Sequence, residues 1–158
     1  MTDRRPDPPN ADGVDPAELV SVGGRVDEVT VCLRFFGDDL DPDEVSQALG
    51  CQPTHALRKG EPVPGRYRRV ASTGSWLLEG RPVDPPDVED TIKGLLARVS
   101  SDLGVWRDLT ARFSADIFCG LFLEREGRGF ELSSSVSAEL AARNLPVGFD
   151  IYGPGRAE

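Results

Sequence analysis

Histidine, cysteine and lysine are scarce in this 158-residue chain, which has one histidine and three cysteines. Only Lys59 and Lys93 are lysines, so nearly all cationic side chains are arginines. The cysteines Cys32, Cys51 and Cys119 are widely spaced and form no Cys-x-x-Cys motif, which argues against a disulfide framework. We expect the cysteines inside strand patterns to pack as small apolar side chains.

Long apolar runs are also absent. No window approaches the roughly 18 apolar residues of a membrane helix. No apolar stretch follows Arg4 and Arg5, so a secretory signal is not expected. The sequence therefore predicts a cytoplasmic protein with no membrane partner. Apolar residues make up 39% of the chain, which is enough for one domain that folds without a disulfide or a metal.

Acidic residues outnumber basic ones and give a net charge of −9. Phosphate backbones attract basic surfaces, so this charge argues against a general nucleic-acid binder. An acidic surface suits a basic protein partner, because complementary charge speeds their encounter.

The distribution of proline and of apolar residues predicts three parts. Residues 1–25 are rich in proline and aspartate and predict a loosely ordered tail, residues 26–153 a single folded domain, and residues 154–158 a polar tail.

Alternating apolar residues and turn signals predict an α+β domain. We expect strands near 29–36, 54–59, 66–70, 75–79, 115–124, 130–132 and 147–152. Helices are expected after Asp41, over 86–103 and from about 134 to 143, with a further short helical segment near Trp106. The prediction is a largely antiparallel sheet of six to seven strands, with two to three helices packed on one face. The order strand, capped helix, strand at both ends also suggests duplicated β-α-β halves.

The acidic run 38–44 has two interpretations. Asp39, Asp41 and Asp43 begin like a calcium-binding loop, but such a loop then needs glycine and glutamate where this chain has Glu44 and Gly50. The run instead predicts a helix start, with Asp41 as N-cap and Glu44 completing a capping box, and Gly50 ending the helix. No metal site is predicted.

Catalytic motifs are not found. His55 is the only histidine, and although Cys51 is near it in sequence, no spacing places them together. The chain has no Gly-x-Ser-x-Gly and no phosphate-binding glycine loop, so we predict no catalytic residues and no cofactor. An enzyme would require Asp38, Asp39, Cys51 and His55 to converge on one pocket.

One basic cluster stands out against the acidic background. Its candidate binding residues are Arg58, Lys59, Arg66, Tyr67, Arg68, Arg69 and Trp76. If the strands carrying them pair, the cluster could bind a phosphate, a carboxylate or single-stranded nucleic acid through ion pairs and stacking. The alternative is a solvated hairpin whose arginines pair with acidic neighbours.

Four segments carry a resemblance to a known family. They are Phe35-Phe36-Gly37, Leu40 to Glu44 with Leu49 to Thr54, Ser75 to Leu78, and Phe149 to Tyr152. Together, over about residues 29–152, they resemble a bacterial family catalogued as domain of unknown function 4279. The resemblance implies a small α+β domain. The family has no established activity, so it implies no site residue.

Three classes of function follow from these features. The favoured one is a non-catalytic binding module, immunity- or inhibitor-like, whose acidic surface docks a basic protein. The second is an anion or single-stranded nucleic-acid site on the strands from Arg58 to Arg69. The third is an enzyme of unknown reaction.

Overall fold

The fold is a single sheet with helices beside it. The computed structural model describes residues 24–125 and 127–154. Its strands are β1 (Glu28–Gly37), β2 (His55–Leu57), β3 (Gly74–Glu79), β4 (Ser114–Phe122) and β5 (Val147–Tyr152). Its helices are α2 (Pro42–Leu49), α3 (Val88–Leu96), α4 (Leu103–Arg112) and α5 (Ser134–Ala142). No helix among these residues is long and apolar enough to cross a membrane.

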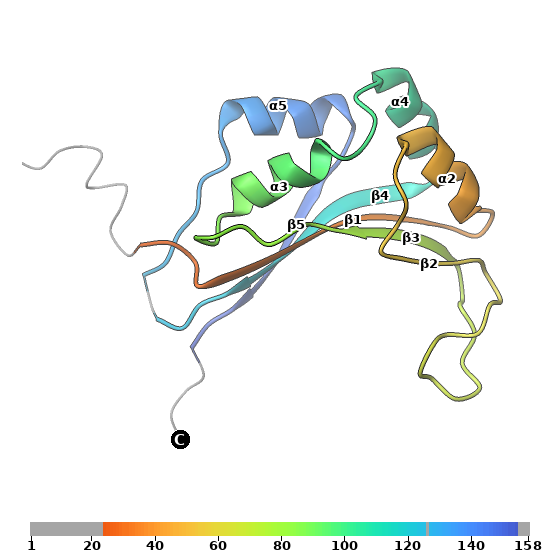
Figure 1. Ribbon diagram of the computed structural model, residues 1–158, viewed down its shortest axis with the longest axis horizontal. Coiled ribbons are helices and arrows are strands. Elements are labelled where there is room, and N and C mark those ends of the chain that lie inside the picture. The colour runs from red at the N-terminus through yellow and green to blue at the C-terminus, as the bar shows by residue number, and fades with distance from the viewer. Residues whose placement is uncertain (1–23, 126, 155–158) are drawn as a thin grey trace, which may run out of the picture.

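The strands are ordered β2-β3-β1-β4-β5, and every neighbouring pair is antiparallel except the parallel pair β4–β5. All four described helices lie over one face of the sheet (Figure 1). The predicted α+β class and the placement of helices on one face are therefore confirmed. The opposite face, which we call the open face, carries Cys32, Arg34 and Phe36 of β1 and is covered by no described helix.

The core lies between the helices and β1, β3 and β4. Alternation along β1 buries Leu33 and Phe35 on the helix side, as the sequence predicts. The Phe35 ring stacks on Trp106 at 6.0 Å between centroids and meets Trp76 edge-on at 5.9 Å. These three rings are fully buried, so they fix how α4 and β3 pack around the central strand.

Helix α2 begins and ends largely as predicted. The Asp41 carboxylate accepts a hydrogen bond from the Asp43 N–H at 3.0 Å, and Gly50 ends the helix with φ 67°. The capping-box prediction for Glu44 is wrong, because its carboxylate binds Arg112 of α4 instead. Glu44 therefore joins two helices rather than closing the end of its own.

The described sheet has five strands instead of six to seven. The predicted strand at 66–70 is a turn, because Gly65 and Arg68 have φ values of 71° and 57°, which reverse the chain. The predicted strand at 130–132 does not pair with β4 either. There Gly129 bridges to Arg25, and the chain runs on towards α5.

The described helices number four rather than two to three, because the predicted helix over 86–103 ends early and α4 is a full helix. The break runs from Ala97 to Asp102. Asp102 accepts the Gly104 N–H at 2.8 Å as N-cap of α4, and the Ser100 carbonyl accepts the Trp106 Nε1–H at 2.7 Å. Short polar side chains favour such caps over the interior of a helix.

The two predicted β-α-β halves have the same order of elements, but their strands pair differently in the sheet. β4 and β5 are direct parallel neighbours, whereas β3 lies between β1 and β2. Most of the predicted tail, residues 1–23, and the C-terminal residues 155–158 lie outside the described residues.

Candidate functional site

The most protruding described segment is the connection between β2 and β3. Residues Gly60–Ala71, which we call the arginine hairpin, project beyond the β2–β3 edge of the sheet and away from the helices (Figure 1). Its two arms are joined by backbone hydrogen bonds of 2.8 Å, from the N–H of Gly60 to the Ala71 carbonyl and from the N–H of Val63 to the Arg69 carbonyl. These hydrogen bonds join the two arms of the hairpin, although it is not part of the sheet.

The tip of the hairpin carries one charge sign. Arg66, Arg68 and Arg69 are exposed and make no ion pair with any described residue. Tyr67 is 88% exposed, and the Arg68 guanidinium lies 5.1 Å from the centroid of its ring. Guanidinium groups bind carboxylates and phosphates, and an exposed ring adds apolar contact area, so this tip is suited to binding an anion.

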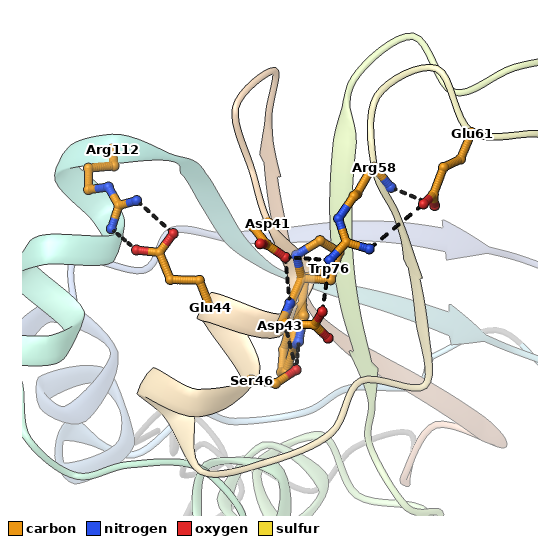
Figure 2. Close-up of polar contacts among 9 residues, drawn as sticks. Asp41, Asp43, Glu44, Ser46, Arg58, Glu61, Trp76 and Arg112 are labelled. Atoms are coloured by element: carbon orange, nitrogen blue, oxygen red, sulfur yellow. Dashed lines mark hydrogen bonds and ion pairs between the residues drawn. The ribbon is translucent and has the colours of Figure 1, made fainter.

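Arg58 and Lys59 do not belong to this tip. Arg58 donates to Asp41 at 2.7 Å and to Asp43 at 2.8 Å, and its backbone N–H donates to Glu61 (Figure 2). Lys59 pairs with Asp38, and this hydrogen bond lowers the pKa of that carboxyl. Two of the five cations of the basic cluster are thus neutralised by the acidic run, as the solvated-hairpin alternative predicts for Arg58 and Lys59.

Trp76 lies far from solvent, although it was predicted to contribute an aromatic face to the patch. Its side chain is 0% exposed, and its Nε1–H donates to the Ser46 hydroxyl at 3.0 Å (Figure 2). The alternation of β3 turns Trp76 towards the helices and Ser75 and Leu77 towards the open face. The candidate site is therefore reduced to Arg66, Tyr67, Arg68 and Arg69.

The four side chains that an enzyme would use do not converge. His55 is 69% exposed, with its Nε2 3.5 Å from Glu79, and the Cys51 thiol donates to its neighbouring carbonyl. Pockets of about 550 Å³ between α4, β4 and α5 and of about 410 Å³ beside Cys32 are lined by other residues. Within the described ranges, no three histidine, cysteine, aspartate or glutamate side chains gather as metal ligands.

The other two cysteines are shielded thiols. Burial raises the pKa of Cys32 to about 11 and that of Cys119 to about 12. A thiol is a weak nucleophile until it loses its proton, so neither group is activated.

Sequence reasoning missed one cluster on the open face. Arg34 binds Asp116 through two hydrogen bonds of 2.8 and 2.7 Å, and its guanidinium lies 4.4 Å from the centroid of the Phe118 ring. Alternation alone places Arg34 on this face. Its partner is fixed only by the register of β1 with β4, which sets Arg34 opposite Asp116. The Asp116 carboxylate already binds the Arg34 guanidinium, so the cluster joins β1 to β4.

The fold and the site together define a small α+β domain with an open sheet face and an arginine hairpin. The family described as domain of unknown function (DUF4279) matches residues 27–154, and the chain belongs to this family. No curated protein and no solved structure matches the chain.

Proposed function

We propose that this protein is a non-catalytic binding module, immunity- or inhibitor-like, whose contact element is the arginine hairpin. The observation that carries the proposal is the tip itself, where three arginines without a described acidic partner flank a tyrosine that is 88% exposed. Tyrosine and arginine, with tryptophan, are the residue types most enriched among the residues that dominate binding energy at protein interfaces.

The order of the hairpin adds to this support. A segment already held by its own backbone hydrogen bonds loses little conformational entropy when it binds. The backbone that carries the three arginines is therefore already arranged when the partner arrives, and only their side chains remain to be ordered.

An acidic protein surface is the partner that this chemistry fits best. The planar guanidinium group pairs with carboxylates through two parallel hydrogen bonds. A net charge of −9 repels a long polyanion, so nucleic acid is the weaker alternative despite the stacking surface of Tyr67.

The competing form of the proposal is a basic partner docked on the acidic surface. Asp38, Asp41 and Asp43 are already paired with Lys59 and Arg58. Such a partner would have to use other acidic groups or displace these cations, and this makes the acidic run a less suitable contact than the hairpin tip.

The test is a tagged pull-down from native lysate, with and without nuclease, using two variants of equal charge. One replaces Arg66, Arg68 and Arg69 with alanine, and the control replaces Arg81, Arg107 and Arg125, which are also exposed. We expect a stoichiometric protein, resistant to nuclease, that binds the wild type and the control but not the hairpin variant.

Each other outcome is informative. A partner that the hairpin variant retains would reject the hairpin and favour the acidic surface. Loss of the partner on nuclease treatment would favour nucleic acid, and an empty pull-down would count against a binding module.

A further inference from the structure

Besides Tyr67 on the arginine hairpin, exposed apolar side chains are found on β5, at one edge of the sheet. β5 pairs with β4 on one side, and none of the described residues pairs with its other side. Ile151 is 59% exposed and Tyr152 is 51% exposed. A strand edge with free backbone groups and apolar side chains is a template for pairing with another strand.

A pair of aromatic rings lies beside this edge on each face of the sheet. On the helix side, Phe130 lies 5.0 Å from Phe149 between ring centroids, and Phe130 remains 41% exposed. On the open face, Phe122 stacks on Tyr152 at 4.9 Å. A lone strand edge is narrow compared with the roughly 1,200–2,000 Å² that a stable interface buries, and the rings widen the apolar area on both faces.

The β5 edge also lacks the features that prevent an edge strand from pairing with a strand of another molecule. β5 contains no lysine and no proline, its pairing with β4 runs without a bulge, and Asp150 is its only charged residue. The opposite edge, β2, is only three residues long. The two edges are therefore unequal, and only β5 presents a long template.

We propose that β5 pairs antiparallel with β5 of a second copy of this chain, so that one sheet runs through a two-fold symmetric dimer. The strand is complementary to itself in one register. With Phe149 opposite its own copy, Val147 faces Ile151 on the helix side and Gly148 faces Asp150 on the open face, so apolar meets apolar and no charges oppose.

The neighbouring registers are poorer. Slipping by one residue would turn side chains of one copy to the wrong face. Centring the pair on Asp150 would set two carboxylates directly opposite. Centring it on Ile151 would set Phe149 opposite Gly153, beyond the end of β5, so an apolar pair would be lost. An isologous contact also closes after two copies, which consumes both long edges and leaves none for further growth.

The first experiment is sedimentation velocity of the full chain over a wide concentration range. Wild type is expected to be a dimer and Ile151→Lys a monomer, because the lysine charge would be buried in the interface. The control Val70→Lys changes a residue of nearly equal exposure, 58%, outside the edge, and should remain dimeric with an unchanged Tm. A wild type that is monomeric at the highest soluble concentration, or an Ile151→Lys dimer, would overturn the proposal.

The second experiment tests the register by cross-linking in a Cys51→Ser background. Gly148→Cys and Asp150→Cys chains should form a disulfide when mixed, and neither should form one alone. A Cβ at Gly148 meets only Phe118, at 3.8 Å, so the substitution fits the fold. Cross-linking of Asp150→Cys with itself would reject the register, and no cross-link in the mixture would reject the pairing.

Discussion

Ser46 shows how one hydroxyl fixes a buried tryptophan. It lies on α2 with 4% of its surface exposed, donates to the Pro42 carbonyl at 2.8 Å and accepts the Trp76 Nε1–H at 3.0 Å. An indole N–H that is buried without an acceptor loses its hydrogen bond to water and gains nothing in return. The helix and the strand are therefore joined by a polar contact inside the apolar core.

Replacing Ser46 with alanine should lower the free energy of unfolding by about 1–3 kcal/mol, because the Trp76 N–H is left unsatisfied. Urea denaturation followed by tryptophan fluorescence measures the change. Ser137→Ala, at an exposed position of α5, is the matched control and should change stability by less than about 0.5 kcal/mol. Equal effects of the two substitutions would contradict the role of Ser46.

At the scale of elements, the patterns that depend on local chemistry were predictable. The alternation of β1 and β4 and the Asp41 and Gly50 ends of α2 follow from side-chain types at fixed spacing. The turn at 66–70 was not predictable, because Arg68 adopts a positive φ without the glycine that usually signals one. The candidate site was predicted only in part. The acidic partners of Arg58 and Lys59 belong to the run 38–44, and only the folded structure brings this run next to the basic cluster.

The N-cap of α2 can be tested apart from its ion pair. Asp41→Ala removes both the cap and the contact with Arg58 and should cost about 0.5–2 kcal/mol. Asp41→Asn keeps an oxygen acceptor for the Asp43 N–H and should cost clearly less. Chemical denaturation of the two variants checks this order, and equal losses would mean that the ion pair, rather than the cap, stabilises the helix.

At the scale of the whole molecule, the net charge of −9 conceals local balance. Pairs between distant segments join α2 to α4 through Glu44 and Arg112, and β1 to β4 through Arg34 and Asp116. Other charges stay unpaired among the described residues, and at the tip of the arginine hairpin three of them, all positive, fall within four residues. The net charge can be counted from the sequence. The positions at which charges remain unpaired depend on how elements far apart in the chain pack together.

The Glu44–Arg112 pair makes a prediction for acid conditions. The Arg112 guanidinium, bound at 2.6 and 3.0 Å, lowers the pKa of Glu44 below its usual 4.5. A carboxyl with a lowered pKa in the folded state stabilises that state above its unfolded pKa, and the stabilisation is lost as the pH falls through the folded value. Glu44→Gln should therefore lower the Tm modestly at pH 7, and the difference from wild type should vanish in strong acid. Thermal melts across this range, with the exposed Glu131→Gln as control, measure the difference. A difference that persists unchanged in acid would show that the contact does not depend on the charge of Glu44.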